Sequence, residues 1–331
     1  MNRLMDALPG VALPVEAVAE TLLHMWDSGP PAEAGPMGYR ASQLNLILHL
    51  GLKATQAETV DRFDTAIRFA QRHPCRLVVL CPSARAPGAA EFEGKLFSQC
   101  YLGGHLRERC CCEALILGYS PEQADFLESQ VSVWLEPDLP VYHWLHRVPA
   151  RRIASHYLGF LARCRRVLFD GAVDGDRYDG LAWPEPQRAV DLARARILPL
   201  RQHLGQFLGA FPPADLVDGL ESLHFHHSPC MAREAWQLMR WMRHALARCF
   251  PHPSGLAGVD CELAPLPEAD AGGRLRVEWR YRKKDRHLRM DYSAARKSGR
   301  IDAALGADKH RQPLHIEPLA PEAVLAEALF F

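Results

Sequence analysis

Short apolar runs alternate along this chain with amphipathic segments of helical length. Residues 43–50 and 75–81 are almost continuously apolar, and residues 58–72 between them repeat apolar side chains at helical spacing. Nearly unbroken apolar runs of this length are typical of strands that are buried on both faces. The pattern predicts an α/β fold with mixed sheets flanked by helices.

The same reading predicts the remaining elements. Helices are expected over 15–27, 58–72, 120–135, 153–164, 188–211 and 231–250, and Pro199 is expected to kink or break the fifth of them. Strands are expected over 43–50, 75–81, 97–103, 111–117, 141–146, 166–172 and 223–227. We expect the strands at 43–50, 75–81, 111–117 and 141–146 to share one sheet, with helix 58–72 packed on it. Two α/β domains are predicted, 1–150 and 151–331.

The C-terminal third contains a predicted antiparallel hairpin. Apolar and charged residues alternate over 274–282 and again over 288–292, so one face is apolar and the other basic. The tryptophan and tyrosine of this segment, Trp279 and Tyr281, fall on the apolar face. Since nucleic-acid binding favours aromatic side chains on an exposed basic face, we expect no nucleic-acid partner.

Composition limits the class of protein. The chain has 331 residues, 48% of them hydrophobic, and its 39 basic residues equal its 39 acidic ones. Its overall charge therefore selects no strongly charged partner. We see no run long enough for a membrane span and no secretion signal, and the ten cysteines are then expected to be mostly free thiols. A cytoplasmic protein without a membrane partner is predicted.

Common catalytic motifs are missing. Neither phosphate-binding glycine loops nor the HExxH and GxSxG patterns occur. We therefore expect a protein that works by binding a partner, without catalytic residues, a cofactor or a metal.

Two clusters of reactive side chains leave alternatives open. The first contains Cys100, His105, Cys110, Cys111 and Cys112. These cysteines could be inert buried thiols, redox-active groups or zinc ligands, although their spacing matches no standard zinc motif.

The second cluster contains His224, His226, His227 and Cys230. Histidines two apart on a strand point to the same side, as a base or metal ligands would. Polar residues at the end of a strand explain the same pattern. If the histidines and nearby arginines line a pocket, the chain is a sugar-phosphate-binding protein or enzyme; if the cysteines act, it is a redox or metal-binding regulator.

Six blocks of sequence resemble one family. They are Gln43–Ile47 (QLNLI), Ala70–Arg76 (AQRHPCR), Cys110–Leu115 (CCCEAL), Glu136–Trp144 (EPDLPVYHW), Val167–Ala172 (VLFDGA) and Asp191–Arg201 (DLARARILPLR). In this order they resemble the OpcA family, the glucose-6-phosphate dehydrogenase assembly proteins. The resemblance covers about residues 40–210, and the C-terminal third matches only in overall pattern.

The resemblance implies a non-catalytic protein that binds glucose-6-phosphate dehydrogenase and favours its active oligomer. It also implies, for photosynthetic relatives, redox control through cysteines and thioredoxin, for which Cys100, Cys110, Cys111 and Cys112 are the candidates here. Ala193 and Leu200 stand where the family has tryptophans. If those rings touch the partner in the family, that contact is altered in this chain.

Charged residues are the predicted partner contacts. Asp138 lies in the EPDLP block between two prolines, which hold the chain extended. The other candidates are arginines in the last block and on the basic hairpin face: Arg194, Arg201, Arg276, Arg280, Arg282 and Arg289.

Overall fold

A computed structural model of the chain describes residues 4–27, 42–83, 92–102, 109–174, 178–266, 272–306 and 308–331. The chain forms two compact units, one made of residues 1–191 with Pro321–Phe331 and the other of Leu192–Ala320. Both combine helices with a mixed sheet, which confirms the predicted α/β class. No helix among the described residues is long and apolar enough to cross a membrane.

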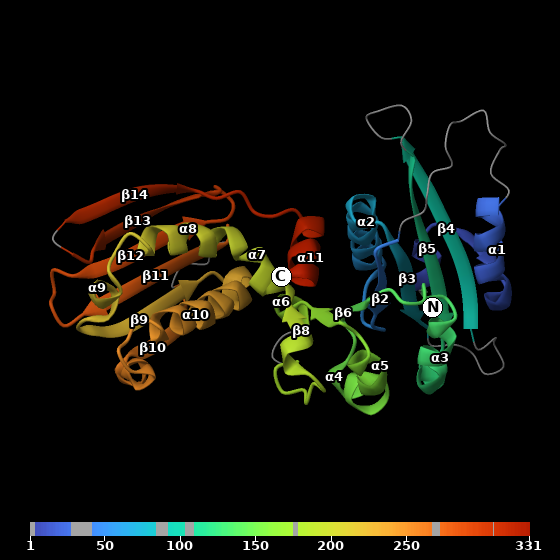
Figure 1. Cartoon of the computed structure of the whole chain (residues 1–331), viewed down its shortest axis with the longest axis horizontal. Helices are drawn as coiled ribbons and strands as arrows, with labels where there is room; N and C mark the ends of the chain where they lie inside the picture. The colour runs from blue at the N-terminus through green and yellow to red at the C-terminus, as the bar shows by residue number, and fades with distance from the viewer. Residues whose placement is uncertain are drawn as a thin grey trace. The chain divides into compact units, whose positions relative to one another are not determined.

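The first unit is built on a sheet of eight described strands in the order β1-β4-β5-β3-β2-β6-β7-β8 (Figure 1). Its strands are β1 (Val11–Leu13), β2 (Leu44–Leu50), β3 (Cys75–Pro82), β4 (Phe92–Leu102), β5 (Arg109–Tyr119), β6 (Val141–His146), β7 (Arg166–Phe169) and β8 (Ala189–Asp191). Strands β5, β3, β2, β6, β7 and β8 run parallel, whereas β4 pairs antiparallel with β1 and β5. The four strands that we expected in one sheet therefore lie together.

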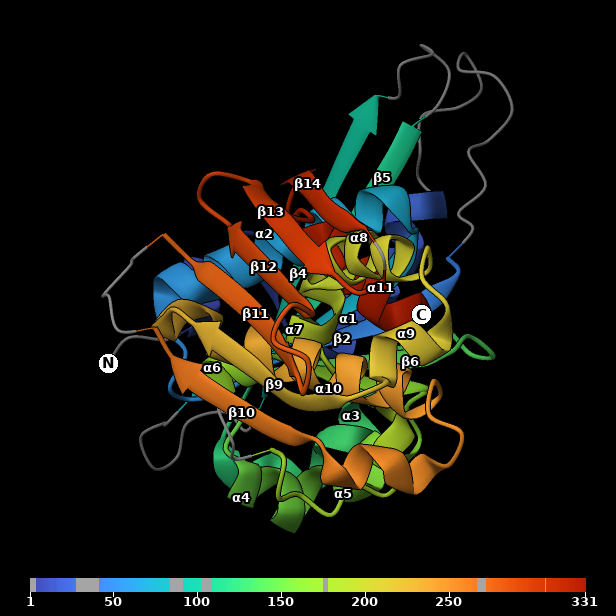
Figure 2. The same ribbon diagram turned by 90° about the vertical axis from the view of Figure 1, so that its left-hand side faces the viewer.

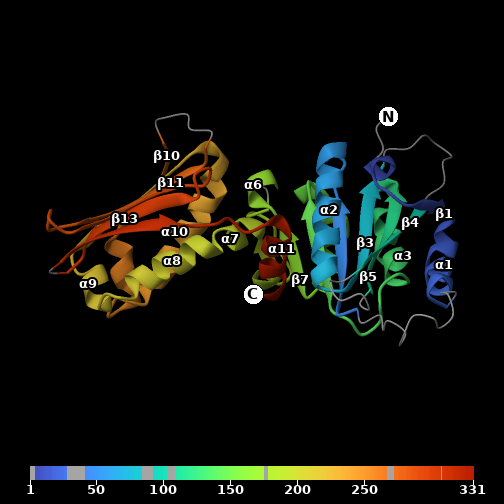
Figure 3. The same ribbon diagram turned by 90° about the horizontal axis from the view of Figure 1, so that it is seen from above.

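Helices cover both faces of this sheet (Figure 3). They are α1 (Val15–Asp27), α2 (Gln56–Arg72), α3 (Leu127–Ser132), α4 (Ala150–Arg152), α5 (Leu158–Ala162), α6 (Gly171–Asp174) and α11 (Pro321–Phe330), with a π-helical turn, η3, at Ile153–Tyr157. Helices α1, α3 and α5 enclose one apolar core against the sheet. Helices α2 and α11 pack together on the other face.

Helix α2 begins at a capping box that its sequence encodes. The hydroxyl of Thr55 accepts a hydrogen bond from the Glu58 amide, and the Glu58 carboxylate accepts one from the Thr55 amide, so both ends of a capping box are present. Its buried side chains recur at helical spacing and include Phe63, Ile67 and Ala70. The predicted packing of this helix on the sheet is confirmed.

The last helix, α11, belongs to the first unit although the second unit precedes it in sequence. Arg68 of α2 donates from Nε to Glu322 at 3.2 Å, and Arg166 donates to the Ala328 carbonyl at 2.9 Å. The Phe330 ring lies 6.2 Å from that of Phe69. Polar and aromatic contacts together hold α11 against α2 and β7.

The second unit has a six-stranded sheet in the order β10-β9-β11-β12-β13-β14 (Figure 2). Its strands are β9 (Leu220–His227), β10 (Asp260–Pro265), β11 (Arg274–Tyr281), β12 (His287–Ser293), β13 (Ser298–Ala304) and β14 (Lys309–His315), and its helices are α7 (Leu192–Arg196), α8 (Leu198–Leu208), α9 (Pro213–Val217) and α10 (Ala232–Ala247). Among the described strands of this sheet, β9 and β10 pair in parallel and all other neighbours pair antiparallel.

The hairpin predicted at 274–292 is confirmed as β11 and β12. Its inward side chains Leu275, Val277, Trp279 and Tyr281 are buried against α8 and α10. The charged side chains alternate with them and lie on the opposite, partly exposed face. The sheet thus has one face covered by helices and one polar face.

Several predicted boundaries are corrected. The helix predicted over 188–211 begins with a strand, β8, and then breaks into α7 and α8 at Ile197, two residues before Pro199. The helix predicted over 120–135 is a 3-10 turn at Pro121–Phe126 followed by α3, which ends at Ser132. The strand predicted over 166–172 ends at Phe169, and α6 follows it. The break expected at Pro199 is confirmed. Proline has no amide hydrogen, and amides in the first turn of a helix have no intrahelical acceptor, so α8 can start at this point.

The domain boundary expected at residue 150 falls inside the first sheet. Strands β7 and β8 follow that residue and extend the sheet by parallel pairing onto β6. The two compact units instead divide between Asp191 and Leu192.

Gly51, at the end of β2, allows an unusually close backbone approach. A Cβ atom there would lie 1.8 Å from the carbonyl oxygen of Arg147, which itself adopts φ of +57° after β6. Gly51 also donates its amide to the His146 carbonyl at 2.8 Å. Any side chain at position 51 must push β2 and β6 apart.

We predict that Gly51→Ala lowers the free energy of unfolding by about 3 kcal/mol, because backbone atoms cannot yield as a side chain can. Gly159→Ala is the control, since a Cβ there meets nothing within 4 Å and the residue lies in α5. That change should stabilise the chain by roughly 0.5–1 kcal/mol. Urea unfolding of both variants measures the contrast; equal stability of Gly51→Ala and the parent would contradict it.

Candidate functional site

Three family-like sequence blocks meet at the amino ends of strands β2, β3 and β6. Asn45 of β2 is completely buried, and its side-chain nitrogen donates to the carbonyls of Glu136 at 3.0 Å and Leu139 at 3.3 Å. Its side-chain oxygen accepts from the Glu136 amide at 2.8 Å. One amide therefore fixes both ends of the segment that leads into β6.

A buried arginine supports the same segment from β3. Arg76 pairs with the carboxylate of Glu136 and donates to the Trp134 carbonyl at 3.3 Å. Only 8% of its side chain is exposed, against 29% for Glu136. An arginine buried to this extent requires such a partner, so Arg76 and Glu136 hold the approach to β6 in place.

The segment that Asn45 and Arg76 hold is a tight turn that presents Asp138, and not the extended chain that the two prolines predicted. Asp138 is exposed and has φ of +64°, a left-handed conformation that aspartate and asparagine adopt more readily than other non-glycine residues. Pro137 precedes it and Pro140 closes the turn before β6. The buried amide and ion pair thus shape a surface feature.

A basic pocket of about 530 Å³ adjoins this turn. It is lined by Leu139, Pro140, Val141, Arg163, Arg165, Arg166, Gln187 and Arg188. Two of its arginines pair with carboxylates outside the pocket, Arg163 with Glu128 at 2.7 Å and Arg188 with Glu185 at 2.8 Å. Together the Pro137–Asp138 turn and this pocket, which we call the turn surface, offer one carboxylate beside several guanidinium groups.

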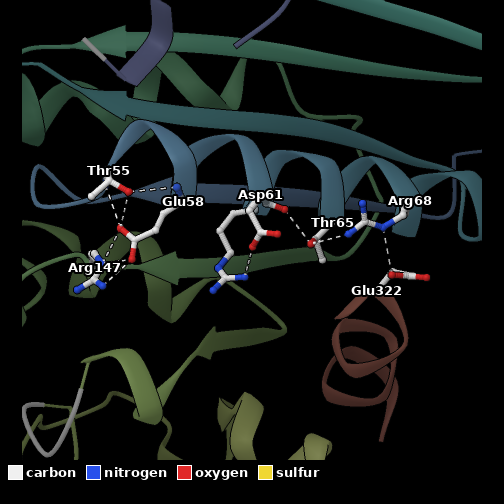
Figure 4. A network of polar contacts seen from close by, with 8 residues as sticks. Thr55, Glu58, Asp61, Thr65, Arg68, Arg147 and Glu322 are labelled. Atoms are coloured by element: carbon white, nitrogen blue, oxygen red, sulfur yellow. Dashed lines mark hydrogen bonds and ion pairs between the residues drawn. The ribbon is translucent and has the colours of Figure 1, made fainter. Parts of the chain in front are cut away.

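The carboxyl ends of β2 and β6 carry a second polar cluster (Figure 4). Arg147 donates to both oxygens of the Glu58 carboxylate, through Nε at 2.8 and 2.9 Å and through Nη2 at 2.5 Å. The same carboxylate caps Thr55 at the start of α2. Glu58 is thus held by an arginine and by a helix N-terminus at once.

This cluster lies at the switch point of the sheet, between β2 and β6, where the chain turns from one half of the sheet to the other. Open α/β sheets commonly bind anionic ligands there, at a helix N-terminus. Here the Glu58 carboxylate lies at that position. The hydrogen bond from Arg147 lowers the pKa of Glu58 from 4.5 to about 2. The chain's own anion is therefore the partner of the N-terminus of α2.

A chain of buried rings crosses the first core. His49 Nδ1 lies 3.1 Å from His143 Nε2, His49 Nε2 lies 2.8 Å from the Tyr119 hydroxyl, and that hydroxyl lies 3.1 Å from the one of Tyr157. Burial lowers the pKa of His49 to about 3 and that of His143 well below its usual value, so both rings are neutral. All four side chains are at most 3% exposed. They link β2, β5, β6 and η3 rather than meeting a ligand.

The predicted histidine pair lies on the polar face of the second sheet. The rings of His224 and His226 are stacked with centroids 6.3 Å apart, as their spacing predicts. His224 also contacts the Ser222 hydroxyl through Nε2 and the Glu262 carboxylate through Nδ1, both at 2.8 Å. This order of contacts occurs in serine hydrolases. However, β9 pairs with strands on both sides, so its amides cannot stabilise an oxyanion.

The predicted contact residues belong to two different units. Asp138 lies in the first unit, whereas the six arginines lie in the second. On the polar face, Arg276 and Arg289 both donate through Nε to Asp291, at 2.6 and 2.9 Å. Arg280 and Arg282 are 63% and 82% exposed and reach carboxylates only at 3.7 Å. This face therefore mixes arginines with carboxylates rather than being purely basic.

The last family-like block lies on α7 and α8. Arg194 is exposed and Arg201 is half-buried. Ala193 and Leu200, which replace family tryptophans, are 0% and 3% exposed. Neither side chain is therefore exposed to a partner in this chain.

The structure tests only part of the prediction that the clustered cysteines are inert, redox-active or metal-binding. Cys112 is buried, and burial raises the pKa of Cys81 and of Cys164 to about 12, which keeps those thiols protonated and unreactive. The side chains of Cys100, Cys110 and Cys111, and all of His105, lie outside the described residues. The described part of the chain has no cluster of three or more metal-ligating side chains. Redox control and thioredoxin remain predictions.

Comparison with known proteins supports the family resemblance. Residues 66–190 match the family model OpcA_G6PD_assem, described as "Glucose-6-phosphate dehydrogenase subunit N-terminal domain". The predicted resemblance to the OpcA family is confirmed. This segment contains Arg76, Glu136, Asp138 and all four arginines of the turn surface.

Other comparisons add little. No curated protein matches the chain. A crystal structure of aldose-aldose oxidoreductase from Caulobacter crescentus complexed with glycerol is similar, with 12% identity, coverage of 86% of this chain and 87% of that chain, and a TM-score of 0.40. A TM-score this low does not establish a common fold.

Sequence reasoning missed the residues that shape both ends of β2. Asn45 interrupts an apolar run, and a polar residue in a buried strand is the signal that a partner must exist. Neither Glu58 nor Arg147 was among the candidate site residues. Since these two residues are 89 positions apart, only the fold brings them together.

We predict that Asn45→Asp destabilises the chain by about 3 kcal/mol, because a carboxylate oxygen would face the carbonyls of Glu136 and Leu139 in place of a donor. Gln43→Glu, at an exposed position two residues earlier, controls for the added charge. Thermal unfolding of the two variants gives the comparison. An Asn45→Asp variant no less stable than the control would show that the amide does not hold the turn.

We predict that Glu58 stabilises the chain above about pH 4.5 and that this contribution is lost as pH falls towards 2. Its folded-state pKa lies below its usual value, so protonation in acid favours the unfolded chain. The difference in unfolding free energy between the parent and Glu58→Gln should therefore shrink across that interval. Asp64→Asn, an exposed carboxylate of the same helix, is the control. A difference that is independent of pH would rule out the assignment.

Proposed function

We propose that this chain is a non-catalytic regulatory partner of a glucose-6-phosphate dehydrogenase, and that it favours the enzyme's active oligomer. The observation that carries the proposal is the convergence of Asn45, Arg76 and Glu136 on one exposed turn. Three separate family-like blocks serve to present Asp138, and the segment that matches the dehydrogenase-subunit family includes this turn.

The arrangement of polar residues favours binding over catalysis. The buried histidines are neutral and shielded from solvent. The anion position at the switch point holds Glu58. Exposed polar groups gather instead on the turn surface, where Asp138 and the neighbouring arginines suit a partner with complementary charges.

A regulatory partner acts through differential affinity. It shifts the enzyme toward one oligomeric state only as far as it binds that state more tightly. The turn surface suits this role, because Asn45 and Arg76 hold its backbone rigid and little ordering is needed on binding. Arg280 and Arg282 on the second unit are candidates for an additional electrostatic contact.

We predict that adding the purified chain raises the activity of the cognate dehydrogenase, while the chain alone oxidises no glucose 6-phosphate. Asp138→Asn should raise the half-activating concentration about tenfold, because it removes the charge and keeps a residue that tolerates positive φ. Activity and oligomeric mass, measured across a titration at low and high salt, test this.

Matched variants separate the surfaces. Asp64→Asn removes one exposed carboxylate elsewhere in the first unit and should leave activation unchanged. Arg280→Gln with Arg282→Gln tests the second contact. If the activation of the dehydrogenase is the same at low and high salt and in every variant, the contact lies elsewhere, and residues 191–211 are the next candidate. If activity and oligomeric mass stay constant at every ratio, the partner proposal fails.

A further inference from the structure

A second arginine-lined pocket opens on the polar face of the second unit. Its volume is about 570 Å³, and it is lined by Gly272, Arg274, Arg276, Arg289, Asp291, Tyr292, Ser293, Ala295, Arg296, Ser298, Gly299 and Arg300. Five of these residues are arginines and one is acidic. Strands β11, β12 and β13 and the turn between β12 and β13 supply the lining.

The single carboxylate orders two of the arginines. Asp291 accepts from Arg276 Nε at 2.6 Å and from Arg289 Nε at 2.9 Å. Burial opposes its ionisation, but the hydrogen bonds from Arg276 and Arg289 outweigh burial and lower its pKa. Both guanidinium groups use Nε for Asp291, and Arg289 also reaches the Glu278 carboxylate through Nη1 at 3.8 Å. The terminal nitrogens of Arg276 form no ion pair with any other described residue and can contact a ligand.

Two further arginines complete the rim. Arg296 and Arg300 are exposed, and neither forms an ion pair with a described residue. Asp291 and Arg300 are directly opposite each other on β12 and β13, so Arg300 lies next to the group that Asp291 orders. The guanidinium groups of the pocket outnumber its carboxylate, which leaves a concentrated positive charge.

Gly299 of β13 lines the pocket beside Asp291. Gly299 is opposite Tyr292, and a Cβ at position 299 would lie 2.2 Å from the Asp291 carbonyl oxygen. A larger residue would therefore displace the backbone of β12 or β13 beside Asp291. The serines at 293 and 298 add hydroxyl groups to the lining.

The volume and lining define a class of ligand. Small-molecule pockets commonly span about 300–1,000 Å³, so this pocket exceeds what one phosphate group needs. Guanidinium groups bind phosphate oxygens with paired hydrogen bonds, and serine hydroxyls can bind the hydroxyls of an attached group. We propose that this pocket binds a small phosphate monoester with a hydroxylated body, such as a sugar phosphate, with Arg296 and Arg300 contacting the phosphate.

Calorimetric titration of the full chain tests the assignment, in buffer without phosphate or sulfate. The probes are a hexose 6-phosphate, inorganic phosphate and the free hexose. We expect saturable binding of the hexose 6-phosphate, weaker binding of inorganic phosphate and none of the free hexose. Arg296→Gln with Arg300→Gln should weaken hexose 6-phosphate binding at least tenfold.

The matched control is Arg280→Gln with Arg282→Gln, which removes two arginines of the same sheet that do not line the pocket. It should change binding less than twofold. If both double variants weaken hexose 6-phosphate binding equally, the effect comes from the overall positive charge of the sheet and the proposed site is wrong. Absence of saturable hexose 6-phosphate binding, or equal binding of the free hexose, would also overturn it.

The outcome is independent of the dehydrogenase. Asp138 lies in the other unit, so Asp138→Asn should leave the binding of hexose 6-phosphate unchanged. Loss of phosphate binding with intact dehydrogenase activation would separate the pocket from the proposed partner function. A failure of activation by a chain that still binds hexose 6-phosphate would reject the partner proposal alone.

Discussion

Parallel pairing of β2 with both β3 and β6 is the constraint on which the first unit depends. All seven residues of β2 are buried, so each polar group at its ends needs a partner inside the protein. At the amino end Asn45 meets the chain that enters β6. At the carboxyl end Gly51 lies against the backbone of Arg147, and that arginine then reaches Glu58. One strand thus sets the geometry of two polar clusters at opposite edges of the sheet.

Elements with a strong apolar pattern could be predicted from the sequence. The bounds of α1 and β6 agree with the expectation, and α2 differs by two residues. Strand β8 was missed because three residues, Ala189–Asp191, are too few to show a period beside a helical run. Strands β13 and β14 were missed as well; β14 has a single buried residue, Leu314, so no alternation marks it.

The candidate sites were predictable only where residues are close in sequence. Asp138 could be singled out because it lies between two prolines in a family-like block, and Arg276 with Arg289 because they alternate with apolar residues on a hairpin. The contributions of Asn45 and Arg147 depend on partners about ninety positions away, and the rim arginines Arg296 and Arg300 depend on how β12 and β13 pair. Long-range pairing of this kind leaves no local signal in one sequence.

The return of α11 to the first unit has a consequence for how the chain is made. Residues 321–331 leave the ribosome only after the whole of Leu192–Ala320 has been synthesised. Until then Phe69 of α2 and Tyr142 of β6 lack their contact with the ring of Phe330, and Arg68 lacks its partner Glu322. The first unit therefore cannot be completed until the whole of the second unit has been synthesised, although most of its own sequence comes earlier.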